Sequence, residues 1–404
     1  MKVPFSPPRI DEKIIQEVTN TLQSGWITTG PKTKLLEKKI KEYVDCSEVL
    51  CLNSATAGME LMLRWFGVKD GDEVIVPAYT YCATANVVIH CGAKPIMVDV
   101  GKDFNIDVKA IEAAITTKTK VIMAVDFGGF PCDYNEIIAI VKREDIRKKF
   151  NAQTEEQKLL GRILMMSDSA HSFGAEYHAH KIGKVVDLAV FSFHAVKNLT
   201  TAEGGAICLN LPPSFNNHEI YKSLCIRILH GQTKDALSKM TGSSWKYDVI
   251  EAGFKCNMTD LQAAIGLVEI ERYKNEHLPK RKYIFEKYAH LLGVYEWAEL
   301  PICQTDQKKS SYHLFPLRIK GITEEQRDRI IEGITAQLIS VNVHFIPLPL
   351  LSFYKKMGYD IKNYPMAYNN YSREISLPVF FDLTDEQIIW VVEALIKEVK
   401  QILF

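Results

Sequence analysis

The sequence predicts an α/β protein with a large lobe, built on a mainly parallel sheet flanked by helices, and a smaller C-terminal α+β lobe. Short apolar runs typical of buried strands alternate with helical stretches from residue 49 to residue 211, and this alternation indicates a parallel sheet covered on both faces. The length of 404 residues exceeds that of one typical domain. We therefore expect a large domain at 1–270 and a small domain at 271–404.

The first half of the chain supplies the elements of the large lobe. The predicted helices are 9–23, 32–44, 56–66, 80–90 and 135–141. The predicted strands are 49–52, 73–77, 94–100, 120–126, 163–166, 188–193 and 206–211. Gly67 directly follows the third helix as a natural stop. The run of mixed charge at 142–162 predicts a helical segment that lies on the surface and is exposed to solvent.

The pattern becomes looser from residue 212 onward. It predicts a long loop region to about residue 252 and then a helix at 259–273, where Thr259 and Gln262 have capping-box spacing. The predicted elements of the small lobe are strands at 313–320 and 341–346 and helices at 323–333 and 384–403. We expect the domain boundary within or just after the helix at 259–273.

The charge balance and the cysteines exclude several classes of protein. Lysine plus arginine and aspartate plus glutamate both total 49, so the chain as a whole does not attract nucleic acid or an anionic membrane. No apolar run reaches the ~18 residues of a membrane span, and the N-terminus lacks the apolar core of a signal peptide. The nine cysteines are odd in number and lack CxxC spacing, which favours reduced thiols and a cytoplasmic location.

Lys197 is the residue around which we expect the function to be organised. The apolar run Leu188–Phe191 predicts a buried strand that leads into FSFHAVKNLTTAEGG at 191–205. Most lysines are solvated surface charges, but a lysine at the end of a buried strand can lose its proton, because desolvation disfavours the ammonium form. A neutral amine attacks carbonyl groups, so this position suits a lysine that forms a Schiff base.

Further polar residues follow other predicted strands, and ligands of such sheets lie beyond the carboxyl ends of the strands. The turn Ser54–Ala57 leads into a helix and offers backbone N–H groups and a hydroxyl to a phosphate, although such small residues also serve only as helix caps. Asp168 ends another strand, where a carboxylate is poorly solvated and needs a cationic partner. Tyr81 and Ser192 lie at two further strand ends.

These residue types match what pyridoxal phosphate (PLP) requires: an amine for the aldehyde, an acid for the ring nitrogen, an anion cradle and a flat contact for the ring. Lys197 is the candidate amine and Asp168 the candidate acid. Tyr81 is the candidate for stacking on the ring, with a core tyrosine as the alternative. The candidates for the phosphate are Thr56, Ala57 and Ser192.

Seven segments, in order, resemble the motif series of the DegT/StrS family of sugar-nucleotide aminotransferases. They are NSATAGMEL (53–61), VPAYTYCATANVV (76–88), DSAHSFGAEY (168–177), FSFHAVKNLTTAEGG (191–205), GFKCNMTDLQAAIG (253–266), VHFIPLP (343–349) and EISLPVF (374–380). The resemblance extends from about Ile10 to the C-terminal helix, and FSFHAVKN with the preceding DSAH is its most specific part. It implies the aspartate-aminotransferase architecture (fold type I) and a homodimer with shared active sites.

The resemblance also implies a role for each matching residue. Lys197 bonds covalently to the cofactor and then moves a proton between cofactor and sugar carbon, while Asp168 pairs with the pyridinium nitrogen. His171 lies by the ring or its hydroxyl, with a core histidine as the alternative. Asn257 reaches the cofactor phosphate of the neighbouring subunit, and Lys255 is the alternative for that contact. The remaining cofactor contacts are Thr56, Ala57, Ser192 and Tyr81.

The implied reaction has two halves. Glutamate gives its amino group to the cofactor, and the amine then passes to a keto-sugar attached to a nucleotide diphosphate. SFHAVK followed by TTAEGG is more similar to family members that act on carbon 4 of a 4-keto-6-deoxy sugar than to those that act on carbon 3, which tend to have SFYPxKNLG. The candidate sugar-side residues, each with a purely structural alternative, are Thr29, His230 and His344. Asp126–Pro131 departs from the family's usual His-Leu-Tyr-Gly-Gln-Pro.

Other functions fit the sequence less well. Family members that use the cofactor for sugar dehydration typically have histidine in place of the lysine, so Lys197 argues against that reaction. Intact Lys197 and Asp168 also argue against a non-catalytic regulator. A dinucleotide-dependent oxidoreductase would need GxGxxG after an early strand, which is absent. Clustered metal ligands are lacking, and we expect His178 and His180 to lie in an exposed turn.

Overall fold

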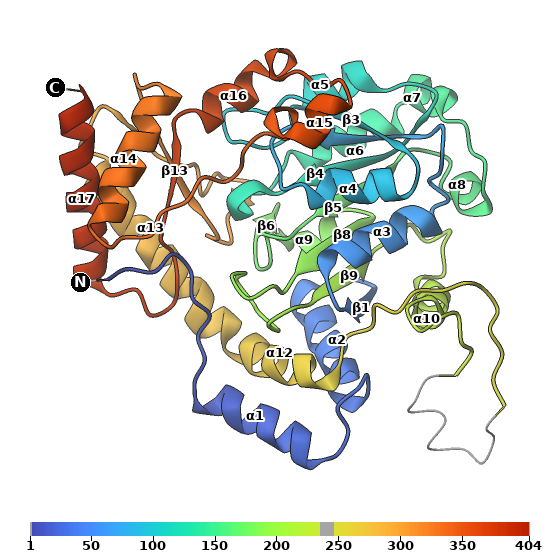
Figure 1. Cartoon of the computed structure of the whole chain (residues 1–404). Coiled ribbons are helices and arrows are strands. Elements are labelled where there is room, and N and C mark those ends of the chain that lie inside the picture. The colour runs from blue at the N-terminus through green and yellow to red at the C-terminus, as the bar shows by residue number, and fades with distance from the viewer. Residues whose placement is uncertain (1, 235–245, 404) are drawn as a thin grey trace.

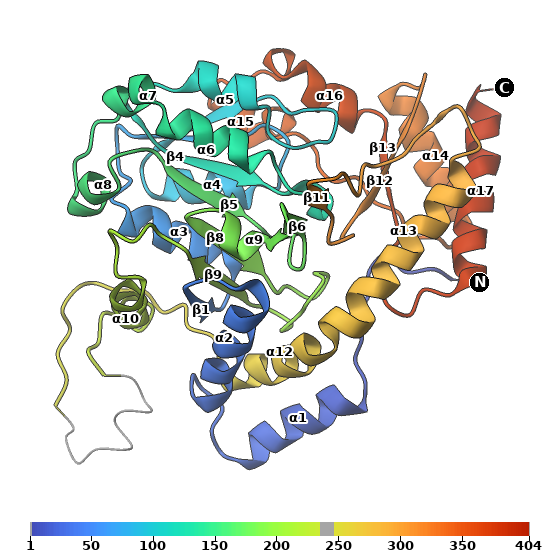
Figure 2. The ribbon, with the colours of Figure 1, turned by 180° about the vertical axis from the view of Figure 1, so that it is seen from behind.

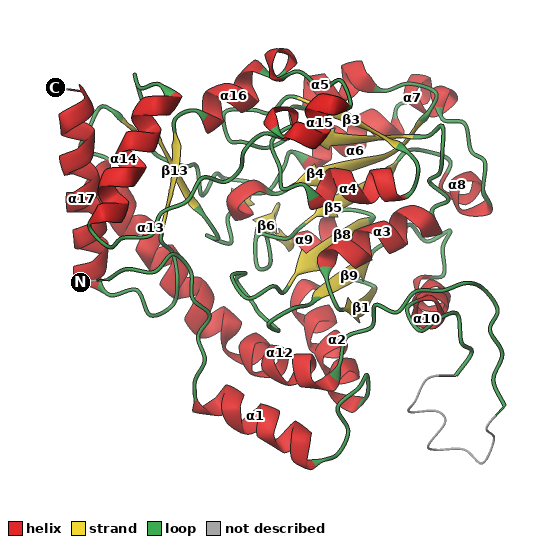
Figure 3. Cartoon of the chain, in the orientation of Figure 1, coloured by secondary structure: helices red, strands yellow, loops and turns green. Residues whose placement is uncertain are grey.

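The computed structural model describes residues 2–234 and 246–403, and its centre is a seven-stranded sheet between layers of helices (Figures 1 and 3). The strand order is β1-β9-β8-β5-β4-β2-β3. These strands are β1 (Glu48–Leu52), β2 (Glu73–Pro77), β3 (Lys94–Val98), β4 (Thr119–Val125), β5 (Leu164–Asp168), β8 (Leu188–Ser192) and β9 (Gly205–Leu209). Neighbouring strands are parallel except where β9 pairs with β1 and β8. The predicted mainly parallel sheet is therefore confirmed.

The reversed direction of β9 follows from the short connection before it. Residues 193–204 link β8 to β9 without a helix, and a parallel return to the neighbouring position would need a longer crossover. The chain instead turns back and pairs antiparallel, with Ser192 opposite Gly205. We call residues 193–204 the lysine loop, because Lys197 lies within it.

Helices cover both faces of this sheet. In chain order the helices of the large lobe are α1 (Glu12–Gln23), α2 (Pro31–Val44), α3 (Ala55–Trp65), α4 (Ala83–His90), α5 (Val108–Ala114), α6 (Tyr134–Lys142), α7 (Glu144–Lys149), α8 (Glu155–Leu160), α9 (Ile182–Val185), α10 (Asn217–Arg227) and α12 (Asp260–Arg272). Alternate strand residues point to opposite faces: Leu50 and Leu52 belong to the core with α3 and α4, whereas Val49 and Cys51 belong to the core with α2, α6 and α12.

The C-terminal part has a core of its own. A three-stranded sheet of β10 (Ala298–Glu299), β12 (Phe315–Ile319) and β13 (Glu374–Leu377) is covered by α13 (Leu278–Leu292), α14 (Glu324–Ala336) and α17 (Asp385–Leu403). α13 continues α12 through a π-helical turn at Tyr273–His277, so the two form one long rod between the parts (Figure 2). The predicted boundary between the large and the small domain, at residues 270 and 271, lies inside this rod and stays a prediction.

Two short helices after residue 350 pack away from this C-terminal core. α15 (Ser352–Lys356) and α16 (Pro365–Tyr371) lie beside α4 and α5 (Figure 1). Their residues Tyr354 and Tyr371 belong to the same hydrophobic core as α3 and α4. A small third sheet is formed by β6 (Glu176–Tyr177), β7 (His180–Lys181) and β11 (Lys308–Lys309).

The structure corrects two predicted segments. α10 lies within the region predicted as loop; Asn216 caps it, and Leu224 is fully buried, but its surface is otherwise too polar to reveal a helix by pattern. Residues 235–245 of the same predicted loop lie outside the described residues. The segment 341–346 is not a strand, because only Asn342 pairs there, in an isolated bridge to Ser376 of β13.

Most other predicted elements are confirmed within a few residues. Thr259 with Gln262 and Thr323 with Gln326 form complete capping boxes at α12 and α14. The charged run 142–162 contains α7 and α8, and His178 and His180 lie exposed next to the β6–β7 turn. Among the described residues, no helix combines the length and the apolar composition needed to cross a membrane.

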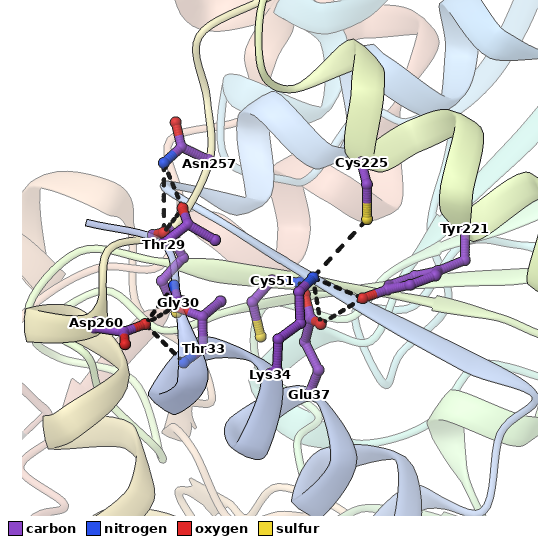
Figure 4. Close-up of polar contacts among 11 residues, drawn as sticks. Thr29, Gly30, Thr33, Lys34, Glu37, Cys51, Tyr221, Cys225, Asn257 and Asp260 are labelled. Atoms are coloured by element: carbon purple, nitrogen blue, oxygen red, sulfur yellow. Dashed lines mark hydrogen bonds and ion pairs between the residues drawn. The ribbon is translucent and has the colours of Figure 1, made fainter. Parts of the chain in front are cut away.

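Asp260 ties the start of α2 to the start of α12 (Figure 4). Its Oδ1 accepts hydrogen bonds from Gly30 N at 2.9 Å, Thr33 N at 2.9 Å and Thr33 Oγ1 at 2.7 Å, and its Oδ2 accepts from Lys32 N at 3.0 Å. α2 begins at Pro31 with no side-chain cap of its own, so a carboxylate from another helix satisfies the free N–H groups of its first turn.

Replacing Asp260 by alanine is expected to destabilise the fold. The buried carboxylate serves four donors at once, so its loss should lower the free energy of unfolding by about 3 kcal/mol. Thermal melting followed by circular dichroism measures this, with the exposed Asp306→Ala as the matched control. A melting midpoint unchanged from wild type would contradict the capping role.

Candidate active site

A cavity of about 590 Å³ opens at the carboxyl ends of the parallel strands. Its walls come from α3, α4, β5, the lysine loop and the C-terminal part of the chain. Seven of the residues predicted for the site line this cavity together: Thr56, Tyr81, Asp168, His171, Ser192, Lys197 and His344. Side chains that are far apart in the sequence therefore meet in one space.

Lys197 is presented to the cavity by a loop that is tightly hydrogen-bonded to itself. Phe193 N donates to Gly204 O at 2.8 Å, Thr201 N donates to Phe193 O at 2.9 Å, and Lys197 N donates to His194 O at 2.9 Å. Burial lowers the pKa of the Lys197 amine to about 8, against a weaker opposing effect of Asp168. Near pH 8, about half of the amine is therefore neutral and nucleophilic.

Asn198 fixes the lysine loop to the C-terminal part of the chain. Its side-chain Nδ2 donates to the backbone oxygen of Ser311 at 2.8 Å, and its Oδ1 lies 2.8 Å from Nδ1 of His313. The residue is buried, so these bonds are shielded from water. The backbone beside Lys197 is thereby fixed from two sides.

Asp168 is a buried carboxylate with few protein partners. It is 5% exposed, accepts from Thr84 Oγ1 at 2.8 Å and from Ala170 N at 3.3 Å, and burial raises its pKa. Asp126 at the end of the neighbouring strand β4 is also buried but does not line the cavity. The carboxylate of Asp126 accepts from Tyr134, Ser172, Ser167 and Cys132. Asp168 alone thus retains capacity for a cationic group placed in the cavity.

The start of α3 provides an anion cradle. Ser54 caps the helix, and its Oγ accepts from Ala57 N at 3.1 Å. The N–H groups of a first helical turn have no partners inside the helix and favour a negative charge. Gly205 brings the start of β9 against this turn, because a Cβ there would lie 2.4 Å from Ala55 N. Thr56 and Ser192 line the cavity, whereas Ala57 does not.

Aromatic rings form another wall. His171 is buried, Gly128 N donates to its Nδ1 at 3.2 Å, and burial holds its pKa well below the usual range, so the ring is neutral with its proton on Nε2. The rings of His313 and Phe345 lie 4.4 and 5.8 Å from that of His171, between centroids. Tyr81 is 60% exposed, with its ring 5.8 Å from that of Phe345.

The other predicted residues lie outside this cavity. Asn257 Nδ2 donates to Thr29 Oγ1 at 2.6 Å, and Thr29 Oγ1 donates to the backbone oxygen of Met258, so these two side chains bind each other near Asp260 (Figure 4). His230 lies in an exposed turn with φ of 64°, and Lys255 is also exposed.

Several cavity residues were not predicted from the sequence. Thr80 lines the cavity just before α4, within the recognised segment 76–88, and its hydroxyl lies 2.9 Å from that of Thr84 on α4. His313 and Phe345 lie in segments predicted as strands, where no periodic signal distinguishes a cavity side chain from a core one. Within 2–234 and 246–403, no three histidine, cysteine or acidic side chains are grouped as a metal site would require.

The family model of the DegT/DnrJ/EryC1/StrS aminotransferases matches residues 8–150 and 154–396. The match is interrupted only at 151–153, inside the charged run between α7 and α8. It thus includes every residue discussed for the cavity except Phe5 and Ser6, which line it from the N-terminal segment.

Individual relatives are also similar to this chain over nearly their whole length. Spr1654 of Streptococcus pneumoniae, assigned as a sugar aminotransferase and solved in a PMP-form, superposes with a TM-score of 0.95 at 45% identity over 99% of this chain and 100% of that one. The uncharacterised protein MJ1066 of Methanocaldococcus jannaschii is 40% identical over 98% of this chain and 97% of its own. The spore coat polysaccharide biosynthesis protein SpsC of Bacillus subtilis is 33% identical over 97% and 96%. A family model that spans nearly the whole sequence and relatives of this similarity agree with the geometry of the cavity, and the chain belongs to the DegT/DnrJ/EryC1/StrS aminotransferase family.

Proposed function

We propose that this chain is a PLP-dependent sugar aminotransferase that moves an amino group from glutamate to a keto-sugar linked to a nucleotide diphosphate, at carbon 4 of a 4-keto-6-deoxy sugar. The observation that supports this proposal best is that Lys197 and Asp168 line the same cavity. The pKa of Lys197 is lowered, and Asp168 is a buried carboxylate that accepts only from Thr84 and Ala170 among the described residues. Spr1654 has also been solved in a PLP-form, at 43% identity.

The residues around the cavity fit this cofactor. Lys197 would hold its aldehyde carbon, Asp168 its ring nitrogen, and Thr56 with Ser192 its phosphate. Tyr81 and His171 would lie against the ring. When bound, the cofactor supplies an electron sink for the carbon that gains or loses the amino group. A buried carboxylate stays ionised next to a cationic ring nitrogen, because the opposite charge offsets the cost of burial.

Lys197 would also move the protons of the reaction. Its Nζ would accept a proton from the carbon of the amino donor in the first half and return a proton to the sugar carbon in the second half. A pKa of about 8 suits both directions near neutral pH. Bonds from Asn198 to Ser311 and His313 keep the lysine loop in place while Nζ alternates between these roles.

The side of the cavity that we assign to the sugar is formed by the C-terminal part, the N-terminal segment and the exposed residues of the lysine loop. Phe5, Ser6, His194, Glu203 and His344 line it there, and we propose His344 as a sugar-side residue. Thr29 and His230 stay candidates only for an assembly in which a second subunit brings them to a cavity. SpsC, by its printed name, acts in polysaccharide biosynthesis, which supports a sugar as acceptor.

We also propose that two copies share their active sites in a cytoplasmic homodimer. Lys255 is exposed, whereas the amide of Asn257 is bound to Thr29, so Lys255 is the freer of the two to reach a partner's phosphate. Exposed apolar side chains available for such an interface lie on and around α1 and α2: Ile10, Ile15, Leu22, Ile27 and Leu35. Sedimentation equilibrium decides between monomer and dimer.

Uptake of PLP by the cofactor-free protein should follow the ionisation of Lys197. Below pH 7 the ammonium form dominates and above pH 9 the amine dominates, so the initial rate should rise with a midpoint near pH 8, far below the ordinary lysine value of about 10.4. The absorption band of the bound cofactor reports the uptake. Lys197→Ala should abolish the band, and the exposed Lys118→Ala should keep it. A colourless wild type would refute the proposed cofactor role.

Asp168→Asn should separate cofactor binding from catalysis. The variant should still attach the cofactor through Lys197, but the half-reaction with the amino donor should slow by about 100- to 1,000-fold, because the electrostatic partner of the ring is lost. Asp126→Asn is the matched control, a buried acid at the next strand end whose partners are all protein groups. It should lower the melting temperature and leave the rate within a few-fold. Equal rates in the two variants would contradict the assignment.

A substrate panel tests the acceptor. Glutamate with nucleotide-linked 4-keto-6-deoxy sugars should yield α-ketoglutarate and a 4-amino sugar, identified by mass spectrometry and NMR. Amination of 3-keto sugars alone would move the assignment to carbon 3. Turnover of glutamate with no sugar aminated would contradict a sugar acceptor, and loss of water from the sugar without amination would indicate a dehydratase.

A further inference from the structure

Three side chains of the C-terminal part form a hydrogen-bonded chain that ends at the cavity. His344 Nδ1 lies 2.9 Å from Ser376 Oγ, and Ser376 Oγ is hydrogen-bonded to Glu374 Oε1. Glu374 and Ser376 are two residues apart on β13, so their side chains share one face of the strand. Both are fully buried, whereas His344 lines the cavity.

The backbone around His344 is fixed in this arrangement. Its N–H donates to Glu374 Oε2 at 3.0 Å, and its carbonyl oxygen accepts from the hydroxyl of Tyr79. The ring of Phe5 stacks on the imidazole with centroids 5.4 Å apart. Among the described residues, Nε2 of His344 has no hydrogen-bond partner, so it is the atom that the ring offers to a ligand.

The single proton of the serine hydroxyl makes the chain directional. When Glu374 is ionised, Ser376 donates to the carboxylate and can only accept from His344, so the imidazole carries its proton on Nδ1 and offers a lone pair at Nε2. When Glu374 is protonated, the direction of both bonds reverses, and the imidazole carries its proton on Nε2. The charge of a buried carboxyl thus sets which tautomer faces the cavity.

We propose that Glu374, Ser376 and His344 form a proton relay whose outer end is Nε2 of His344 in the active-site cavity. A proton taken up at Nε2 releases the Nδ1 proton to Ser376 Oγ, and the hydroxyl proton passes to Oε1 of Glu374. The reverse sequence returns the proton to the cavity. The imidazole is neutral before and after, and the only net change is neutralisation of the carboxylate.

The relay rests on the proposed function for its task. Exchange of a carbonyl oxygen for nitrogen at the sugar carbon releases water, and two protons move from nitrogen to the departing oxygen. His344 would take up one of these protons at Nε2 and return it to the oxygen. His344 is then a catalytic residue, and Ser376 and Glu374 are positioning residues that act through it.

The electrostatics favour transfer of the proton from His344 to Glu374. Burial and the charge of Lys197 lower the pKa of His344 to about 3, so a proton does not stay on the ring as a second charge. Burial raises the pKa of Glu374 to about 8, although its hydrogen bonds and the charges of Arg327 and Arg318 oppose the rise. The carboxyl therefore accepts and releases a proton near neutral pH.

Other ionisable groups face the relay without titrating in that range. His171 and His313 lie near the imidazole and are held neutral by burial, with each pKa well below the usual range. Tyr79 faces the carboxyl, and burial raises its pKa well above the usual range. Lys197 is the exception, with its own midpoint near 8, so the test reads His344 directly instead of relying on rates alone.

The first experiment uses the wild-type protein without cofactor. Nitrogen NMR of the histidine rings distinguishes Nδ1–H from Nε2–H, and His344→Gln assigns the signals. We expect the Nδ1–H tautomer of His344 above pH 9, the Nε2–H tautomer below pH 7, and a midpoint near 8 that is absent in Glu374→Gln. A single tautomer across this range in wild type would overturn the relay. The outcome does not depend on any activity of the enzyme.

The second experiment measures the sugar half-reaction. Ser376→Ala should lower kcat by about 100-fold with KM nearly unchanged, and Ser376→Thr, which keeps the hydroxyl, should restore most of it. Ser372→Ala is the matched control, at a neighbouring serine whose hydroxyl donates to Asn369 O at 3.3 Å. The half-reaction with the amino donor should stay intact in all three variants.

The two proposals fail in different ways. Full sugar turnover in a folded Ser376→Ala, with only its melting temperature reduced, would overturn the relay and leave the aminotransferase assignment standing. A wild type that aminates no sugar would refute the proposed acceptor, while the tautomer measurement would still decide whether the relay exists.

Discussion

The structure depends on the placement of an amine and a carboxylate in one poorly solvated cavity. Lys197 and Asp168 both lose hydration on folding. This loss lowers the pKa of Lys197 and raises the pKa of Asp168. Their mutual attraction offsets only part of that cost. The surrounding fold must supply the remainder through the buried sheet, because charges without full partners are unstable inside proteins.

Two different parts of the fold share the task of holding this pair. The parallel sheet places Asp168 at the end of β5 and feeds the chain into the lysine loop after β8. The C-terminal part then contacts that loop through Ser311 and His313 and closes the cavity with His344 and Phe345. Neither part forms the site alone, which explains why the residues that line the cavity are spread over almost the whole sequence.

The sequence predicted the cavity better than its surroundings. Asp168 was predicted because an apolar strand ends there, and Lys197 because an apolar strand leads into the loop that contains it. Glu374 and Ser376 were not found, because residues inside a short buried strand look like core positions until the partner strand is known. Asn257 and Thr29 bind each other, a pairing across 228 positions that no local pattern encodes. α10 was missed because its exposed surface hides its single buried leucine.

The attachment of Asn198 to Ser311 has a consequence for how substrates enter. Any swing of the C-terminal part away from the sheet would pull on the segment that holds the reactive amine, so opening by such a hinge would disturb the very group it exposes. Among the residues that line the cavity, Phe5 and Ser6 are partly exposed and His194 and Glu203 are exposed, so this rim offers an entrance that leaves the bond between Asn198 and Ser311 intact. The framework can then stay rigid through turnover, with motion confined to its entrance.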